Sequence, residues 1–240
     1  MSTTSVKQGG VSVITCTNRP HCFKDVINNY IRQQYRSKQL IIILNKDSMN
    51  LSDYRKKIRS FPNITIYKAP EKFTLGRCLN FAISKARYQL IAKFDDDDYY
   101  SPYYLSEQIK ALRQSGAGIV GKAAHLKYFE GKRLIAVTTP KQQHQFVKFV
   151  AGGTLLFKKR VYNVVRFKDI TLGEDSDFLL RSRRKGFKIY SSSPYNFVGI
   201  RRKNKKTHTW TASDEKVLSG SQVIARTIQY RQFAVHPFDD

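Results

Sequence analysis

Apolar and polar residues alternate along the first 115 residues in blocks whose lengths suit strands and helices in turn. Short β-branched or apolar runs predict buried strands, and longer segments with apolar residues three or four apart predict amphipathic helices. The predicted strands are 11–17, 39–45, 64–67 and 88–94, and the predicted helices are 23–35, 74–86 and 102–114. Such alternation is typical of a mostly parallel sheet with helices on both faces.

After Gly116 the pattern becomes less regular. Apolar segments at 123–129 and 133–139 flank Glu130-Gly131-Lys132 and predict a β-hairpin. The remaining predicted elements are a strand at 154–157, a helix at 175–185 that ends at Gly186, a strand at 187–190, a basic loop at 201–206 and a helix-like stretch at 214–230. Because the sequence has no repeat and no linker rich in Pro, Gly or Ser, we expect residues 1–240 to form one domain.

Polar segments follow three of the predicted strands, at 15–19, 45–47 and 95–98. The carboxyl ends of parallel strands meet at one edge of a sheet, where ligands bind, so we expect these segments to converge. The last segment consists of four consecutive aspartates, Asp95 to Asp98. Adjacent carboxylates repel one another, and a bound divalent cation relieves the repulsion. The alternative interpretation is a solvated acidic turn.

Charge and composition narrow the class of protein. A hydrophobic content of 41% with 12% aromatic residues indicates a globular chain. The 43 Lys and Arg residues against 18 Asp and Glu give a net charge of +25, which predicts anionic partners such as nucleotides, nucleic acid, anionic lipid or an acidic polymer. Nucleic acid is disfavoured, because no RRM, KH, zinc-finger or helix-turn-helix pattern occurs.

The cysteines and the apolar runs indicate in which compartment the protein is expected to lie. The three cysteines, Cys16, Cys22 and Cys78, lack CxxC spacing and a paired His cluster, which argues against a disulfide framework or zinc site and favours a reducing cytoplasm. The first ten residues are polar and do not resemble a signal peptide. No run approaches the ~18 apolar residues of a membrane span, so we expect any membrane contact to be peripheral, at the inner face.

The segments that carry chemistry resemble those of family 2 glycosyltransferases with the GT-A fold. They are VSVITCTNRP (11–20), GRCLN (76–80), FDDDDYYSP (94–102), AGGT (151–154), GEDSDF (173–178) and HTW (208–210). Each motif alone is weak, while their order and spacing are specific. The resemblance implies a Rossmann-like α/β fold with a mixed, more irregular C-terminal half. Residues 11–115 would then bind the nucleotide and 116–210 would hold the acceptor and the catalytic groups, with no role assigned to 211–240.

In that family the acidic strand end holds a divalent metal, Mn²⁺ or Mg²⁺, against the donor's diphosphate. By this resemblance Asp97 is the metal-binding residue, Asp95 opens the D-x-D motif and shares the metal, and Asp96 approaches the ribose. Because the aspartates are consecutive, the register is open by one residue, and Asp98 is alternatively a helix cap. His208 resembles a histidine that reaches the metal or diphosphate in some relatives; a structural histidine is the alternative.

The Glu174-Asp175 pair resembles the family's acidic motif at a helix start. An inverting transferase needs a carboxylate that accepts the proton of the attacking hydroxyl. The resemblance assigns this role to Asp175, with Glu174 orienting the acceptor. The alternative is that both carboxylates only stabilise the helix dipole.

Donor binding is expected to involve several further residues near the strand ends and in the basic loop. They are Thr15, Asn18, Arg19, Asp47, Arg77, Arg201 and Arg202, with Asn45 as the alternative to Asp47. Arginine suits phosphate because its planar donors match phosphate oxygens. Arg77 is alternatively a helix-surface residue, and Trp210 either stacks on a sugar or packs.

The expected function is therefore metal-dependent, inverting sugar transfer from a nucleotide-sugar donor, a UDP-sugar by resemblance, to a hydroxyl acceptor. The acceptor would be a carbohydrate or glycoconjugate, with an anionic one suggested by the basic surface, in cell-surface or spore polysaccharide synthesis. The alternative is a non-catalytic basic module on the same fold that binds an anionic polymer or nucleic acid. A nucleotidyltransferase fits less well, because the turn at 18–20 is not a glycine-rich phosphate loop.

Overall fold

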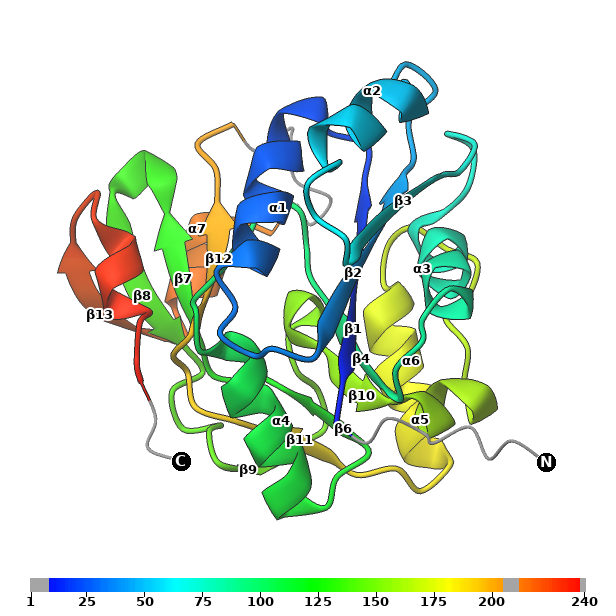
Figure 1. Ribbon diagram of the computed structural model, residues 1–240. Coiled ribbons are helices and arrows are strands. Elements are labelled where there is room, and N and C mark those ends of the chain that lie inside the picture. The colour runs from blue at the N-terminus through cyan, green and yellow to red at the C-terminus, as the bar shows by residue number, and fades with distance from the viewer. Residues whose placement is uncertain (1–8, 205–211, 238–240) are drawn as a thin grey trace.

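Two β-sheets organise the computed structural model, which describes residues 9–204 and 212–237 (Figure 1). The larger sheet has eight strands, which run from edge to edge in the order β3 (Ile64–Lys68), β2 (Lys38–Leu44), β1 (Val11–Thr17), β4 (Leu90–Lys93), β10 (Leu156–Lys158), β6 (Ile119–Gly121), β11 (Ile189–Ser191) and β9 (Gln145–Phe146). The smaller sheet has five strands, in the order β13 (Ser221–Arg226), β8 (Leu134–Thr138), β7 (His125–Phe129), β12 (Phe197–Arg201) and β5 (Tyr99–Tyr100).

Parallel pairing in the larger sheet brings the predicted polar segments to one edge. Strand β1 pairs in parallel with β2 and β4, and β2 pairs in parallel with β3. In this register Ile14 of β1 lies beside Ile41 on one side and Lys93 on the other. Strand β10 is antiparallel to β4 and β6, and β9 is antiparallel to β11, so the predicted mostly parallel sheet is confirmed with a mixed far half.

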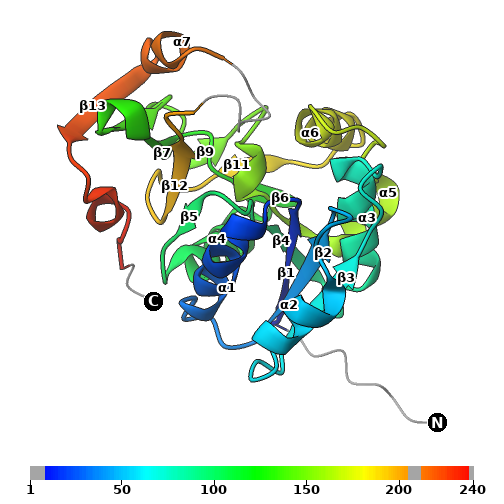
Figure 2. The same cartoon turned by 90° about the horizontal axis from the view of Figure 1, so that it is seen from above.

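Helices cover both faces of this sheet, as predicted (Figure 2). On one face lie α1 (Phe23–Ile31) and α4 (Tyr104–Ser115), and α2 (Leu51–Lys57) lies by β3; on the other lie α3 (Leu75–Ser84), α5 (Lys159–Val164) and α6 (Glu174–Arg184). Buried aliphatic and aromatic side chains fill both layers, which supplies the apolar burial that stabilises the fold. Across residues 9–204 and 212–237, no helix combines the length and the apolar character needed to cross a bilayer.

The smaller sheet contains the predicted hairpin. Strands β7 and β8 pair antiparallel, joined by a single 3₁₀ turn at Glu130–Lys132. The prediction of one helix over 214–230 is wrong: α7 (Asp214–Leu218) is short, and β13 pairs antiparallel with β8. Gly220 follows the helix, and the free edge of β8 offers backbone partners that a continued helix would leave unused.

The chain crosses from the larger to the smaller sheet through the acidic segment. Strand β4 ends at Lys93, and β5 begins at Tyr99 and pairs with β12. The aspartates between them are therefore held from both sheets. This position fixes the carboxylates at the junction of the two halves of the molecule.

Candidate active site

Asp96 and Asp97 are tied to the end of β1 by Arg19. Asp96 is buried and accepts hydrogen bonds from the Thr17 hydroxyl and from Nε of Arg19 at 3.1 Å. Another nitrogen of the same guanidinium donates to Asp97 over 2.7 Å. Arg202 adds a second cation at 3.2 Å from Asp97. The end of β1 thus meets the acidic segment, as expected for segments that follow parallel strands, and the start of the basic loop joins them.

Asp98 anchors the acidic segment to the smaller sheet. Its Oδ1 accepts a hydrogen bond from the backbone N–H of Ile200 in β12 at 2.9 Å. Burial, together with the charges of Asp97 and Asp95, raises the pKa of Asp98 well above its usual range. Since α4 begins at Tyr104 with Tyr103 as its N-cap, Asp98 does not cap that helix.

Asp95 is held by a buried lysine. Lys93, the last residue of β4, forms an ion pair with Asp95, and its side chain is only 4% exposed. Burial opposes the charge of Lys93, yet the negative charges of Asp95, Glu174 and Asp175 raise its pKa. Lys93 is therefore a cation placed between the two predicted acidic motifs, and its ammonium offsets the repulsion between them.

The Gly152-Gly153 turn lets these carboxylates approach one another. A Cβ built on Gly152 would overlap Oδ2 of Asp175, and one built on Gly153 would lie 2.8 Å from Oδ2 of Asp95 and 3.0 Å from Oδ2 of Asp98. The Tyr100 hydroxyl donates to the carbonyl of Gly153 at 2.6 Å and accepts from the backbone N–H of Asp95 at 2.7 Å. Only glycine leaves room for this packing.

Helix α6 presents Glu174 and Asp175 from its first turn. Glu174 is 5% exposed, and burial, with a smaller contribution from Asp175, raises its pKa to about 7, while Lys93 opposes the shift. Asp175 is partly exposed, and its Oδ1 accepts a hydrogen bond from the N–H of Ser176 at 2.6 Å. Asp175 is thus the more accessible of the two carboxylates. Its Oδ2 faces Gly152.

The GRCLN motif positions the segment that leads into α6. The amide of Asn80 donates to the carbonyl of Phe167 at 2.8 Å and accepts from the N–H of Phe167 at 3.1 Å. Gly76 donates its backbone N–H to the carbonyl of Ile170 at 3.0 Å, and a Cβ there would overlap the carbonyl of Lys168. The motif therefore fixes residues 167–170 against the start of α3.

Four of the predicted donor-binding residues have surroundings other than the two acidic segments, 95–98 and 174–175. Thr15 is 1% exposed within β1, and Asn18 is exposed just beyond that strand. The carboxylate of Asp47 accepts a hydrogen bond from the backbone N–H of Glu71 at 3.2 Å. The guanidinium carbon of Arg77 lies 3.8 Å from the ring centroid of Phe73, on the helix surface. Their roles in donor binding stay predictions.

The basic loop is only partly described. Arg201 is buried, and its Nε donates to Asp214 at 2.9 Å, whereas Arg202 faces Asp97. The predicted metal ligand His208 and the neighbouring Trp210 lie outside the described residues. Arg201 therefore joins the loop to α7, and Arg202 joins Arg19 at the acidic segment.

The carboxylate oxygens are of the kind that hard divalent cations prefer. Side-chain exposure is 34% for Asp95 and 14% for Asp97, so both can be reached from solvent. Within residues 9–204 and 212–237, no three His, Cys, Asp or Glu side chains are grouped in a way that would hold a metal by themselves. The donor set thus fits Mn²⁺ or Mg²⁺ in chemistry, with the remaining ligands to come from elsewhere.

A family model resolves what kind of protein this is. The model described as glycosyl transferase family 2 matches residues 12–207, a span that includes both acidic motifs. The chain belongs to glycosyl transferase family 2. The predicted family is thereby confirmed.

Comparison with individual proteins gives one relative in sequence and similar solved structures. The O-antigen biosynthesis glycosyltransferase WbnJ of Escherichia coli is 28% identical over 158 residues, which are 63% of this chain and 62% of the relative. The structure of S. aureus TarS 1-349 in complex with UDP-GlcNAc superimposes with a TM-score of 0.66 and 15% identity, over 88% of this chain and 64% of that one.

A second solved structure gives a similar likeness. The mannosyltransferase PcManGT from Pyrobaculum calidifontis, in complex with GDP-Man and Mn²⁺, has a TM-score of 0.65 and 16% identity, over 81% of this chain and 57% of that one. These likenesses confirm the GT-A fold. The chain spans between 57% and 64% of the length of the three relatives.

Four residues of this site are not predicted from the sequence with the roles they have. Thr17 and Tyr100 fix the acidic segment, Lys93 neutralises it, and Gly152 makes room for Asp175. A signal exists for Lys93, because a lysine inside a buried apolar strand needs a nearby counter-charge. The glycine pair also carries a signal, since two adjacent glycines before a strand indicate a close backbone approach.

Proposed function

We propose that this protein transfers a sugar from a nucleotide-sugar donor to a hydroxyl acceptor with inversion at the anomeric carbon. The observation that carries the proposal is the meeting of the two acidic segments, 95–98 and 174–175, across Gly152-Gly153. An isolated acidic helix start would support only the dipole interpretation. Carboxylates brought together against their mutual repulsion indicate a site under functional constraint.

The proposed base is Asp175. As the acceptor oxygen forms its bond to the anomeric carbon, the bond between that carbon and the diphosphate oxygen breaks, and its electron pair leaves with the nucleoside diphosphate. The hydroxyl proton passes to the carboxylate of Asp175, which is partly exposed. Glu174, buried and next to Lys93, would hold the acceptor or Asp175 in place. Attack from the face opposite the leaving group inverts the configuration.

The proposed donor site lies at Asp95, Asp96 and Asp97. When bound, Mn²⁺ or Mg²⁺ would neutralise the charge that develops on the leaving diphosphate. Asp95 and Asp97 would hold it, with diphosphate oxygens and His208 as further ligands. Arg19 and Arg202 flank Asp97, so both lie where a diphosphate would meet these carboxylates. A UDP-sugar is the proposed donor by the resemblance to the family; the TarS structure holds UDP-GlcNAc and the PcManGT structure holds GDP-Man, so GDP-sugars are the alternative.

The proposed acceptor is a carbohydrate or glycoconjugate of the cell surface. Support comes from the name of the E. coli relative, which places that protein in O-antigen biosynthesis. The net charge of +25 favours an anionic acceptor. We also infer a reducing, cytoplasmic location, because Cys16, Cys22 and Cys78 all carry free thiols.

Calorimetric titration with UDP, with and without Mn²⁺, tests the donor site. We expect metal-dependent binding that Asp97→Ala weakens at least about tenfold, because a charged ligand to the metal is lost. Asp53→Ala, on the exposed side of α2, is the matched control and should bind as the wild type does. Failure to bind UDP, GDP and dTDP alike would contradict the proposal.

Turnover distinguishes the enzyme from the basic binding module. Release of UDP from a panel of UDP-sugars, followed by NMR of the product's anomeric proton, reports both transfer and stereochemistry. An inverted anomer is expected. A retained anomer would contradict the assigned mechanism, and tight UDP binding without turnover on any acceptor would support the binding module instead.

A further inference from the structure

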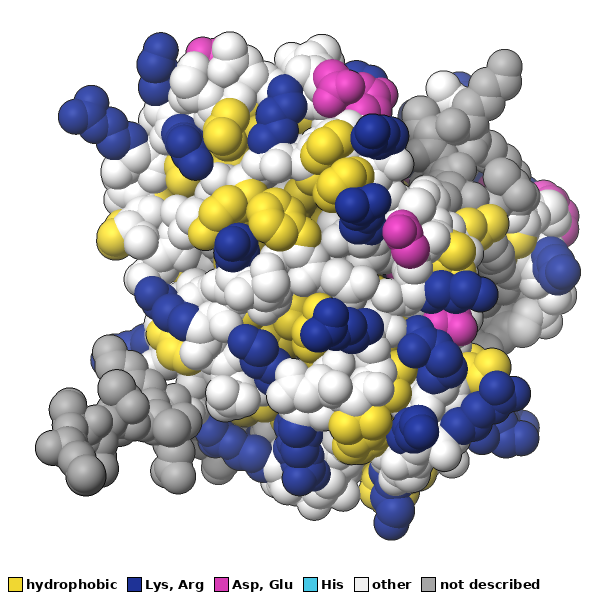
Figure 3. All heavy atoms as spheres, turned by 90° about the vertical axis from the view of Figure 1, so that its right-hand side faces the viewer, with side chains coloured by type: hydrophobic (Ala, Val, Ile, Leu, Met, Phe, Trp, Pro, Cys, Tyr) yellow, Lys and Arg dark blue, Asp and Glu magenta, His cyan; other side chains and the backbone are white. Residues whose placement is uncertain are grey.

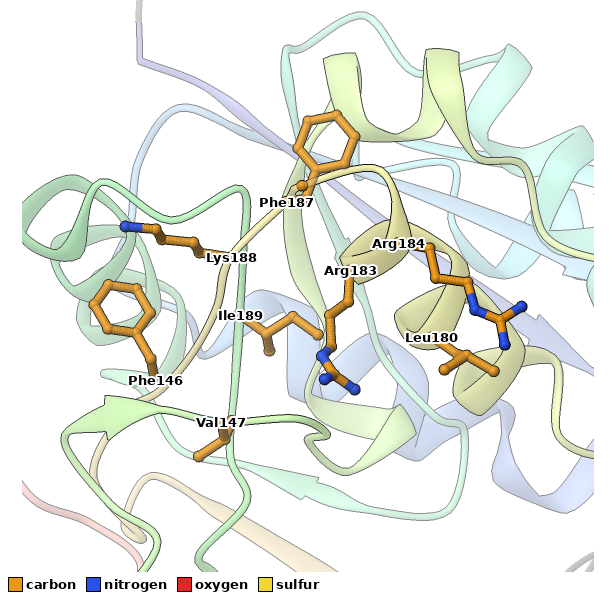
Figure 4. Close-up of a pocket in the computed structure, with 9 residues that line it drawn as sticks. Phe146, Val147, Leu180, Arg183, Arg184, Phe187, Lys188 and Ile189 are labelled. Atoms are coloured by element: carbon orange, nitrogen blue, oxygen red, sulfur yellow. The ribbon is translucent and has the colours of Figure 1, made fainter.

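Basic side chains are widely spread over the protein, but apolar side chains are exposed among them. On the side that carries α3 and α5, Lys and Arg surround apolar patches and carboxylates are few (Figure 3). One cavity of this mixed type has a volume of about 650 Å³ and lies at the C-terminal end of α6, between that helix, residues 186–189 and the edge strand β9 (Figure 4). Glu174 and Asp175 lie at the other end of α6, in its first turn.

Six residues form what we term the basic–aromatic face: Phe146, Phe149, Leu180, Arg183, Arg184 and Lys188. In Figure 4, Phe146 and Lys188 lie at one side of the cavity, and Leu180 and Arg184 lie at the other. The nine residues that line the cavity include three cations and no carboxylate. The cavity is thus open to an anionic ligand.

The apolar members of this face are exposed. Phe146 is 52% exposed, Phe149 43% and Leu180 36%. Each phenylalanine lies under a cation: Nζ of Lys188 is 5.4 Å from the ring centroid of Phe146, and the guanidinium carbon of Arg183 is 5.9 Å from that of Phe149. Exposed aromatic rings paired with long basic side chains are suited to a boundary between water and an apolar phase.

The position of the face keeps it separate from the carboxylates. Strand β9 is the outermost strand of the larger sheet, opposite the edge formed by β3 and covered by α2. Arg184 is nine positions after Asp175, which is about 13 Å along the helix axis at 1.5 Å per residue. A partner seated on this face would leave the first turn of α6 uncovered.

We propose that the basic–aromatic face docks on the surface of an anionic phospholipid bilayer. Phe146 and Phe149 would enter the boundary between headgroups and acyl chains, and Arg183, Arg184 and Lys188 would contact the lipid phosphates. A soluble anionic polymer with base or sugar rings can use the cations and stack on the phenylalanines, but it gains little from the exposed aliphatic side chain of Leu180, so the observations favour the bilayer. The proposal does not depend on sugar transfer, and its test requires no enzymatic activity.

Co-sedimentation of the full chain with vesicles tests the docking. One set of vesicles contains phosphatidylcholine with phosphatidylglycerol, and the other contains phosphatidylcholine alone. We expect at least about tenfold stronger partitioning to the anionic vesicles, and a large loss in 1 M salt, where the Debye length falls to about 3 Å. Equal partitioning to both vesicle types would overturn the proposal.

Two double variants separate the apolar from the charged contribution. Phe146→Ser/Phe149→Ser and Arg183→Glu/Arg184→Glu should each weaken binding at least about fivefold, since both buried apolar area and charge contribute. The charge-matched control is Arg55→Glu/Lys56→Glu on α2, at the opposite edge of the sheet, and the apolar control is Val223→Ser/Ile224→Ser on β13. Thermal unfolding midpoints check that each variant is folded.

The controls give the outcomes that contradict the proposal. If Arg55→Glu/Lys56→Glu weakens vesicle binding as much as Arg183→Glu/Arg184→Glu does, the binding depends on the net charge of the protein and not on this face. If the phenylalanine variant binds vesicles as the wild type does while Arg183→Glu/Arg184→Glu abolishes binding to dextran sulfate, the face is a polymer site. Loss in both face variants, with both controls retained, supports the bilayer.

Discussion

The two ends of helix α6 place charge in opposite environments. At the first turn, Glu174 is 5% exposed, and Asp175 faces a glycine that leaves no room for a side chain. At the last turn, Arg184 is exposed beside an open cavity. A buried charge needs fixed partners, so its position is determined to within a fraction of an ångström, whereas an exposed charge is screened and free to reorient.

This difference separates two uses of charge on one helix. The acidic end is suited to chemistry, because its groups are held in place before a ligand arrives. The basic end is suited to attraction, because long side chains cover a wide area without needing a fixed geometry. Substitutions at the acidic end should therefore change rates and stability, and those at the basic end should change where the protein binds.

Asp175→Asn is expected to have the largest effect on activity. Asparagine keeps the shape of the side chain but cannot accept the proton, so transfer should fall by about 10²–10⁴-fold. UDP binding should be unchanged, because the donor carboxylates remain. The readout is the turnover number with saturating donor and acceptor.

Asp177→Asn is the control for that change. It removes a charge from the same helix turn, where Asp177 pairs with Arg181. If both variants lose activity equally, the carboxylates act on the helix dipole and Asp175 is not the base.

Lys93→Met should lower the free energy of unfolding, because it removes a cation from the acidic end. Methionine fills similar space but leaves Asp95, whose side chain is 34% exposed, without its buried cation, and losing a hydrogen bond between charged groups costs about 1.5–3 kcal/mol. Urea unfolding at pH 7 measures the free energy of unfolding. Lys56→Met on the exposed side of α2 should cost almost nothing, and an equal cost for both would show that Lys93 is not a required counter-charge.

Gly152→Ala tests the close approach at Asp175. The added methyl group would overlap Oδ2 of Asp175 and displace it by a large part of an ångström, and a 1 Å misplacement can reduce a rate by about 10²-fold. Gly220→Ala is the control, because a Cβ there meets nothing within 4 Å. Normal turnover of Gly152→Ala, with the fold intact, would contradict the proposed geometry.

The pH dependence of stability should show the smallest effect. Burial raises the pKa of Glu174 to about 7, so between about pH 4.5 and 7 the folded protein keeps a proton that the unfolded chain releases. The free energy of unfolding therefore falls as pH rises through this window. Urea unfolding from pH 5 to 8 should show a shallower fall for Glu174→Gln than for the wild type.

An exposed glutamate serves as the comparison for this titration. Glu215→Gln on α7 should follow the wild-type curve, because its carboxyl lies at the surface. Parallel curves for the wild type and Glu174→Gln would mean that Glu174 is ionised throughout the range.

Much of the fold is predictable because the longer strands and helices carry a clear periodic pattern of apolar residues. The predicted strand at 11–17 matches β1 to the residue, and the predicted helix at 175–185 matches α6 within one residue at each end. Strands of two residues, such as β5 and β9, give no periodic signal because their formation depends on the neighbouring strand. Residues 214–230 begin with a real helix, α7, which ends at Leu218, and the edge of β8 then pairs with residues 221–226 as β13.

The site is predictable in its residue types and less so in its pairings. Because the carboxyl ends of parallel strands meet at one edge of a sheet, the sequence predicts that Arg19 lies near Asp96 and Asp97. It does not predict that one guanidinium binds both carboxylates. Nothing local in the sequence indicates that Asp98 reaches Ile200, because that bond joins residues 102 positions apart. Pairings of this kind depend on the register of two sheets, which a single sequence does not specify.

The arrangement of Arg19 and Lys93 has a consequence for synthesis on the ribosome. Both cations precede the aspartates that they neutralise, so Asp95, Asp96 and Asp97 emerge into a nascent chain that already carries their partners. Asp175 follows Asp98 by 77 residues, an interval of roughly 4–15 s at about 5–20 residues per second. During that time Arg19 and Lys93 offset part of the negative charge at the ends of the four parallel strands, before Arg202 adds its contact with Asp97. The order of residues along the chain thus supplies two of the cations of the acidic segment before the segment itself is made.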